Sequence, residues 1–171
     1  MRAIVLILCA VLLNGCLGMP ESVKPVSDFE LNNYLGKWYE VARLDHSFER
    51  GLSQVTAEYS ARSDGGISVL NRGYSEEKGE WKEAEGKAYF VNGSTDGYLK
   101  VSFFGPFYGS YVVFELDREN YSYAFVSGPN TEYLWLLSRT PTVERGILDK
   151  FIEMSKERGF DTNRLIYVQQ Q

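Results

Sequence analysis

The side chains that could carry out chemistry are few in this sequence, and their spacing matches no familiar catalytic pattern. His46 is the only histidine, so neither a histidine-based triad nor a metal site with two imidazoles can be built. The sequence contains no nucleophile elbow, phosphate-binding loop, paired-cysteine metal motif or dinucleotide fingerprint. Glu40 is the remaining candidate acid inside the domain, although such a glutamate more often faces outward or is hydrogen-bonded near the barrel floor. We therefore expect a protein that is not an enzyme, with no cofactor and no metal site.

Both cysteines lie at the N-terminus, inside and directly after the only long apolar run. Met1-Arg2 gives a positive start, and residues 3–13 carry no charge. The run is too short for a helix that crosses a ~30 Å hydrocarbon core, and its length and flank are typical of a secretory signal peptide. Cys9 lies within this run, and Cys16 follows it closely.

The segment Leu13-Asn14-Gly15-Cys16 resembles the lipobox of bacterial lipoproteins. This resemblance implies a signal peptide over residues 1–15, cleavage before Cys16 and acylation of Cys16, which would anchor the protein to a membrane. An ordinary signal peptide with an incidental cysteine is the alternative. Leu17, and not Asp, follows the cysteine; by resemblance to sorted lipoproteins, this favours the outer membrane over the inner. We expect the domain to face the periplasm, although the sequence leaves the side of the membrane open. Pro20 and Pro25 then predict a flexible tether over residues 16–28.

The composition predicts one soluble globular domain over residues 29–171. Of the 171 residues, 44% are apolar and 24% are charged, which is enough apolar surface to exclude wholesale disorder. The net charge is −5 and no cluster of Lys and Arg occurs, so we expect no nucleic-acid partner. Tyr and Phe are abundant, with 12 and 10 copies, which favours strands packed on an apolar core.

Short alternating segments separated by turn residues predict an all-β domain. Eight strands are expected, near residues 36–43, 55–59, 67–71, 80–90, 99–103, 111–116, 121–126 and 133–139. The period then changes to that of an amphipathic helix over residues 142–158, and a short final strand is expected at residues 164–168. Eight consecutive strands favour an antiparallel up-and-down barrel with the helix packed outside, although alternation alone does not exclude a sandwich.

Three segments, in order, resemble the signatures of lipocalins. They are Gly36-Lys37-Trp38-Tyr39, a looser match at residues 117–124, and Leu137-Ser138-Arg139-Thr140-Pro141. Residues 48–51, 101–107 and 133–135 are similar to bacterial outer-membrane lipocalins, the relatives of apolipoprotein D. The resemblance covers residues 29–171 and implies an eight-stranded barrel. Gly36, Trp38 and Arg139 are then structural, with Trp38 at the barrel floor and Arg139 over its indole.

The inward face of such a barrel is the expected ligand site. Alternation indicates the interior positions, Phe125 and Trp135 being added by parity, and the resemblance supports Tyr59, Phe103, Tyr111 and Trp135. The predicted lining residues are Tyr59, Asn71, Ala88, Phe90, Val101, Phe103, Tyr111, Val113, Phe125 and Trp135. At the mouth, His46 and Arg50 would attract a phosphate, with Asp45 and Glu49 offsetting their charge; plain solvation of this loop is the alternative.

These expectations predict a lipid-binding protein at the outer membrane. An apolar cavity would store or transport a fatty acid or a lysophospholipid, in a role that includes envelope maintenance under stress. An enzyme acting on a cavity-bound lipid or isoprenoid and an anchored interaction module with a filled barrel are the alternatives. Whether the protein is a monomer or a homodimer is left open.

Overall fold

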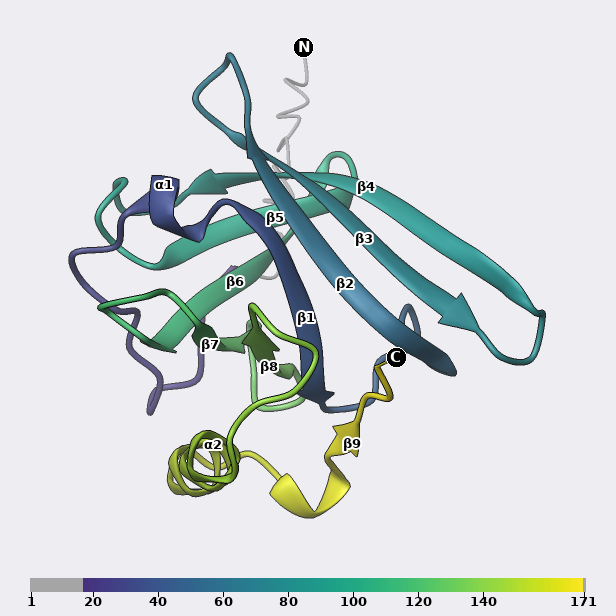
Figure 1. Ribbon diagram of the computed structural model, residues 1–171. Coiled ribbons are helices and arrows are strands. Elements are labelled where there is room, and N and C mark those ends of the chain that lie inside the picture. The colour runs from purple at the N-terminus through teal and green to yellow at the C-terminus, as the bar shows by residue number, and fades with distance from the viewer. Residues whose placement is uncertain (1–16, 171) are drawn as a thin grey trace, which may run out of the picture.

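The computed structural model describes residues 17–170, whose strands form one closed antiparallel barrel (Figure 1). Neighbouring strands pair in sequence order, and β1 pairs with both β2 and β8, which closes the ring. The predicted up-and-down barrel is confirmed, and a two-layered sandwich is wrong. The strands are β1 (Gly36–Arg43), β2 (Leu52–Ala61), β3 (Ile67–Ser75), β4 (Glu80–Phe90), β5 (Tyr98–Phe104), β6 (Phe107–Leu116), β7 (Tyr123–Ser127) and β8 (Leu134–Ser138).

The predicted helix and final strand lie outside this barrel. Helix α2 (Arg145–Glu157) begins shortly after Pro141 and ends before Gly159, whose φ of +85° suits the end of a helix. A short 3₁₀ helix, η1 (Thr162–Arg164), leads to β9 (Ile166–Tyr167), which pairs with the last two residues of β1. None of the helices within residues 17–170 is both long and apolar enough to span a bilayer.

Two apolar cores form on the opposite faces of the barrel wall. The inner cluster includes Trp38, Tyr59 and Val113, whose side chains point into the barrel. The outer cluster lies between the wall and α2, and Phe151 of the helix is fully buried there. Alternation along the strands places successive side chains in different cores. The apolar face of α2 packs against the outer side of the barrel wall.

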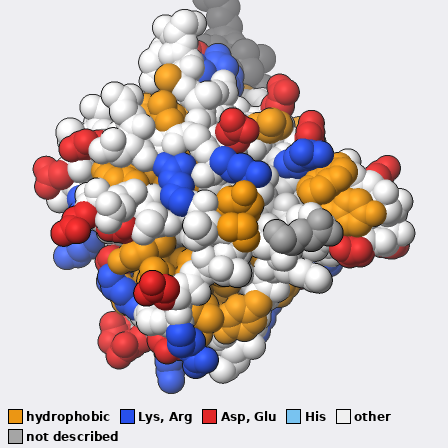
Figure 2. Space-filling view, in the orientation of Figure 1, with side chains coloured by type: hydrophobic (Ala, Val, Ile, Leu, Met, Phe, Trp, Pro, Cys, Tyr) orange, Lys and Arg blue, Asp and Glu red, His pale blue; other side chains and the backbone are white. Residues whose placement is uncertain are grey.

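The two ends of the barrel differ. A short helix, α1 (Leu31–Tyr34), covers one end, and its Tyr34 packs on Trp38 with ring centres 4.8 Å apart. Up-and-down topology brings the β1–β2, β3–β4, β5–β6 and β7–β8 connections together at the other end, which we call the mouth. On the face seen in Figure 2, apolar side chains form small separate patches between charged side chains of both signs.

Residues 17–28 do not form the free tether that the prolines suggested. Val23 and Val26 are buried, one in the outer cluster and one in the inner cluster. The Val26 amide donates to the carbonyl of Val113 over 2.9 Å, and the Gly18 amide donates to the Tyr98 hydroxyl over 3.0 Å. Two valines in a polar segment thus provide enough buried surface to dock it on the barrel. Cys16 itself lies outside the described residues.

The C-terminal segment joins β1 to β2 near the mouth. The Val168 amide donates to Val41 of β1 over 2.9 Å, and the Gln54 amide of β2 donates to Gln169 over 2.7 Å. The side-chain amide of Gln170 then donates to the carbonyls of Glu40 and Val55, over 2.7 and 3.0 Å. Direct pairing of β1 with β2 covers only Gly36 to Tyr39. Between Tyr39 and the mouth, the C-terminal segment bridges the two strands.

Candidate functional site

A cavity of about 580 Å³ occupies the barrel interior and reaches the mouth. Its volume falls within the range of small-ligand pockets. Small inward side chains leave this space open, since Ala57, Ala84 and Ala88 face it from β2 and β4. Aromatic and aliphatic groups make up most of the remaining wall, among them Tyr59, Val69, Leu99, Val101, Phe103, Tyr111 and Trp135. The barrel is therefore hollow, and its lumen suits a hydrocarbon chain.

Most of the predicted lining residues face this lumen. Of the ten predicted residues, the seven that line the cavity are Tyr59, Asn71, Ala88, Val101, Phe103, Tyr111 and Trp135. Phe90 and Val113 also point inward, but they pack in the inner cluster, where Phe90 contacts Phe29 with ring centres 6.0 Å apart. They belong to the packed closed end and do not border the open space.

Phe125 is misplaced by the parity argument. Its ring is fully buried in the outer cluster and contacts Phe151 of α2, with ring centres 5.0 Å apart. Tyr121 faces the inner core, but its φ of +51° belongs to a turn, so strand alternation begins only at Tyr123. Counting by twos from Tyr121 therefore assigns Phe125 to the wrong face, and Ala124 and Val126 point inward instead.

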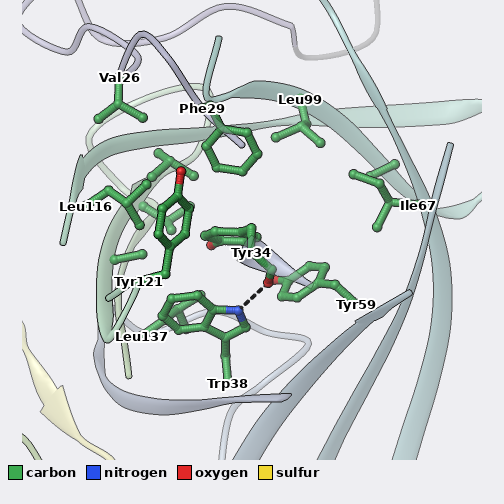
Figure 3. Packing of buried hydrophobic residues seen from close by; sticks show 14 of the residues in the cluster. Val26, Phe29, Tyr34, Trp38, Tyr59, Ile67, Leu99, Leu116, Tyr121 and Leu137 are labelled. Carbon is green, nitrogen blue, oxygen red and sulfur yellow. Dashed lines mark hydrogen bonds between the residues drawn. The ribbon is translucent and has the colours of Figure 1, made fainter. Parts of the chain in front are cut away.

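The closed end is held by Trp38 and Arg139 (Figure 3 shows Trp38 beneath Tyr34). The Trp38 indole donates to the Tyr34 carbonyl over 2.8 Å. The Arg139 guanidinium lies 3.9 Å from the centre of the Trp38 ring and donates to the carbonyls of Lys37 and Asn33. Gly36 has a φ of +94°, and a Cβ there would come within 3.5 Å of Arg139. These residues pack together as a floor.

Three tyrosines place hydroxyl groups at the inner end of the cavity. The Tyr111 hydroxyl lies 2.6 Å from that of Tyr34 and 2.9 Å from that of Tyr59. Burial raises the pKa of all three well above the ordinary tyrosine value, so they stay protonated at neutral pH. Three hydroxyl protons share two hydrogen bonds, which leaves one donor for another acceptor.

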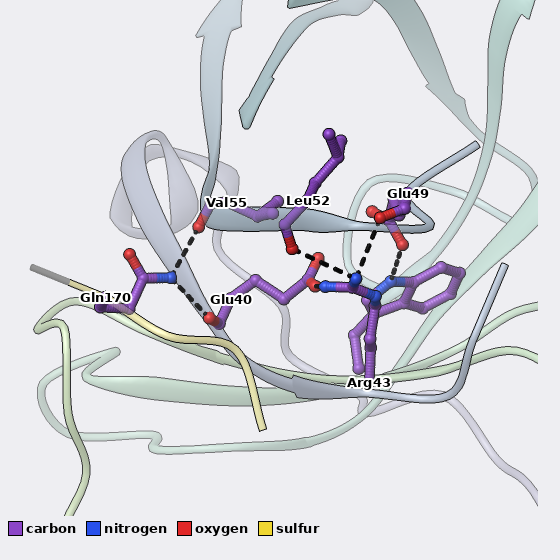
Figure 4. A network of polar contacts seen from close by, with 7 residues as sticks. Glu40, Arg43, Glu49, Leu52, Val55 and Gln170 are labelled. Carbon is purple, nitrogen blue, oxygen red and sulfur yellow. Dashed lines mark hydrogen bonds and ion pairs between the residues drawn. The ribbon is translucent and has the colours of Figure 1, made fainter. Parts of the chain in front are cut away.

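A polar network lies in the opposite part of the wall, toward the mouth (Figure 4). Arg43 Nη1 contacts Glu40 Oε1 at 2.7 Å, and Arg43 Nη2 donates to the Glu49 carbonyl over 3.0 Å. The Trp135 indole donates to Glu49 Oε2 over 3.1 Å. Burial raises the pKa of both glutamates, and for Glu40 the nearby Glu49 raises it further. Glu40 is therefore buried, borders the cavity and is paired with Arg43, and it does not face outward.

The mouth loop does not form the predicted phosphate site. His46 is buried and stacks between Phe48 and Tyr133, with ring centres 5.2 and 4.6 Å away. Burial, and then the charge of Arg43, lowers the pKa of His46 to about 4, so the ring is uncharged at neutral pH. Arg50 contacts Asp45 at 2.7 Å on the surface, so neither basic residue faces the lumen.

Sequence reasoning missed the roles of Tyr34, Arg43 and Glu49. Tyr34 lies on a one-turn helix, so strand periodicity gave no signal for it. Arg43 and Glu49 are charged, and charged residues are almost never fully buried unless they are paired. The spacing of Glu40 and Arg43 gave no signal either, because residues three apart on a regular strand face opposite sides. An irregularity of β1 between Glu40 and Ala42 brings the two side chains together.

Comparison with known proteins agrees with this architecture. A family model described as a lipocalin-like domain matches residues 29–170. The outer membrane lipoprotein Blc of Vibrio cholerae serotype O1 is 97% identical over 171 residues, the full length of both chains. The protein of the same name from Escherichia coli K12 is 52% identical over 151 residues, covering 88% of this chain and 85% of that protein.

More distant proteins are similar in sequence or in fold. Apolipoprotein D of Mus musculus is 28% identical over 159 residues, covering 89% of this chain and 82% of that protein. Insecticyanin from the tobacco hornworm Manduca sexta superposes with a TM-score of 0.70 at 23% identity, over 87% of this chain and 85% of that one. Lobster apocrustacyanin A1 gives a TM-score of 0.66 at 20% identity, over 89% and 93%.

Proposed function

Because this chain belongs to the family of lipocalin-like domains, we propose that it binds one single-chain amphiphile, a fatty acid or a lysophospholipid, inside the barrel. The observation that carries this proposal is the open, apolar lumen of about 580 Å³. Burying a chain of about fourteen carbons contributes roughly 10 kcal/mol, at ~0.8 kcal/mol for each methylene. Association costs on the order of 4–15 kcal/mol, so burial of the chain leaves at most about 6 kcal/mol, which corresponds to a Kd of tens of micromolar. Contacts to the head group must supply any tighter binding.

The setting that we propose for this binding is the outer membrane. The highly similar proteins from Vibrio cholerae and Escherichia coli carry the name outer membrane lipoprotein, and the lipobox-like segment of this chain ends at Cys16. Acyl chains on Cys16 would hold the barrel beside the lipids that it stores or carries, as maintenance of the envelope requires. The names of these relatives denote lipoproteins and lipocalins, which favours binding over catalysis.

The test is direct titration of the cavity. The Cys16→Ala chain, which lacks the acylation site, is stripped of lipid and incubated with myristate or with a myristoyl lysophospholipid. Native mass spectrometry then counts the bound molecules, and calorimetry gives the affinity. One molecule per chain, bound more tightly than about 1 mM, supports the proposal, whereas binding no tighter than that contradicts it.

A matched pair of variants on β2 locates the site. Ala57 lines the lumen, whereas Ser60 is exposed on the same strand. Ala57→Trp fills part of the cavity and should abolish amphiphile binding, because the added ring takes the volume of the chain. Ser60→Trp adds the same side chain elsewhere and should leave binding unchanged. Equal binding by both variants would place the ligand outside the barrel.

A further inference from the structure

The cavity wall near the mouth contains two buried acids and one buried base. The side chains of Arg43 and Glu40 are 2% and 5% exposed, and Glu49 is 7% exposed. With all three ionised, this part of the wall carries one negative charge in excess. A buried charge is costly unless another charge or a proton neutralises it.

The excess charge is shared by Glu49 and Glu40, whose carboxyl groups are hydrogen-bonded to each other. Arg43 directs one nitrogen to the Glu40 carboxylate and the other to the main-chain carbonyls of Glu49 and Leu52, so its guanidinium is used elsewhere. The Glu49 carboxyl receives the indole N–H of Trp135, which is a neutral donor. Among residues 17–170, no Lys, Arg or His forms an ion pair with Glu49.

The surroundings of Glu49 are those that a cationic head group requires. Glu40, Glu49, Phe48, Tyr133 and Trp135 all border the cavity on this side, so carboxyl groups and aromatic rings meet at one place. Aromatic faces attract ammonium groups, and more strongly where water is excluded. The basic residues of the mouth loop do not compete, because Arg50 pairs with Asp45 at the surface.

We propose that the Glu49 carboxyl, with the rings of Trp135 and Tyr133, forms a subsite for the ammonium group of an amphiphile whose chain fills the barrel. This inference rests on the proposed amphiphile binding and names the head group that the site prefers. Ethanolamine lysophospholipids and simple long-chain amines share this chemistry. Without ligand, one proton shared by Glu49 and Glu40 neutralises the pair, and the ammonium takes the place of that proton.

This exchange of a proton for a cation links binding to pH. Burial raises the pKa of Glu49, and a bound ammonium opposes this rise because it stabilises the carboxylate. The other ionisable groups around this site are Glu40 and Arg43 of β1, His46 of the loop and Tyr59 of β2. His46 and Tyr59 are neutral at pH 7, so the proton that leaves comes from the pair of glutamates. Affinity for an ammonium ligand therefore increases as the pH rises through the raised glutamate pKa.

The experiment compares probes with one chain and different heads. The delipidated Cys16→Ala chain is titrated with tetradecylammonium and with tetradecanol by calorimetry, in two buffers of different ionisation enthalpy. We expect tetradecylammonium to bind at least about tenfold more tightly, because charge-assisted hydrogen bonds are markedly stronger than neutral ones. The measured binding enthalpy should differ between the two buffers for tetradecylammonium and not for tetradecanol, because only binding of the amine releases a proton.

Glu49→Gln is the critical variant, since it keeps an oxygen acceptor for Trp135 and removes the charge. It should bind tetradecanol as the unsubstituted barrel does, which shows that it is folded, and should lose both the amine preference and the proton release. Glu77→Gln makes the same charge change at the exposed β3–β4 turn and should lose neither. A preference for the amine that survives in Glu49→Gln overturns the subsite.

Two further outcomes are decisive. Equal affinity of the unsubstituted barrel for both probes overturns the ammonium subsite while amphiphile binding stands. Failure to bind either probe overturns the proposed function and the subsite with it. Myristoyl lysophosphatidylethanolamine is then compared with myristoyl lysophosphatidylglycerol to identify the source of the ammonium group. Tighter binding of the ethanolamine lipid assigns the site to the lipid head group. Equal binding of the two lipids assigns the site to long-chain amines.

Discussion

The guanidinium of Arg139 lies over the indole of Trp38, 3.9 Å from the ring centre, and bonds three carbonyls around it. These carbonyls belong to Asn33, Lys37 and Tyr121, so one side chain joins α1, β1 and the β6–β7 connection. Both side chains serve the closed end and neither borders the open cavity. The floor is therefore a stability element, separate from ligand choice.

Arg139→Ala should lower the free energy of unfolding by about 3 kcal/mol, because it removes the cation–π contact and leaves carbonyls without a donor. Urea denaturation measures this loss. Arg145→Ala, which removes an exposed arginine paired with Asp149, should change stability by less than about 0.5 kcal/mol. A floor variant as stable as this control would contradict the structural role.

Phe151→Ala should destabilise the protein by about 3–5 kcal/mol, since its ring is fully buried between α2 and the barrel. The outer cluster does not line the lumen, so the affinity for amphiphile should persist under conditions where the variant is folded. Glu153→Ala, on the exposed side of the same helix, serves as the control. Loss of binding by the folded variant would show that the helix shapes the cavity.

His46 makes stability depend on pH. Its folded pKa is lowered to about 4 from the ordinary 6.5, so the folded chain binds fewer protons than the unfolded chain between these values. The contribution of neutral His46 is complete above pH 6.5 and is lost as the pH falls toward 4. His46→Phe keeps a ring in the stack and should flatten this part of the profile. Thermal unfolding at a series of pH values checks it, and an unchanged slope would contradict the assignment.

Gln170→Ala should loosen the join between β1 and β2, because it removes two hydrogen bonds that end on strand carbonyls. We expect a loss of about 1–2 kcal/mol and faster amide exchange on either side of the join. Hydrogen exchange read by mass spectrometry measures this. Exchange that stays unchanged near Val41 and Gln54 would mean that the main-chain bonds of the tail are sufficient.

Cys16→Ala should move the protein from the membrane fraction to the soluble fraction, because it removes the thiol that the acyl chains require. Cell fractionation followed by immunoblotting gives the answer. Cys9→Ala, inside the predicted signal peptide, should remain with the membranes. A Cys16→Ala chain that still sediments with membranes would contradict the anchor.

The barrel could be predicted from the sequence because alternation and turn residues are local signals, as along Glu80–Phe90. The resemblance at Trp38 and Arg139 then separated a barrel from a sandwich. What failed depended on contacts far apart in the chain. Val26 meets Val113, Gln170 joins two strands, and Glu49 meets Trp135, and no local pattern encodes these pairings. Phe125 failed for a different reason, since a turn at Tyr121 restarted the alternation.

The amide of Gly18 is held by the hydroxyls of Tyr98 and Ser110, on the outside of the barrel wall. Only Leu17 separates this fixed point from Cys16, a reach of about 7 Å at ~3.3–3.6 Å per residue. Acyl groups at Cys16 would thus hold this side of the barrel wall close to the membrane surface. If Cys16 is acylated and the barrel binds lipid as proposed, the nearest source of that lipid is the leaflet in which the anchor is inserted.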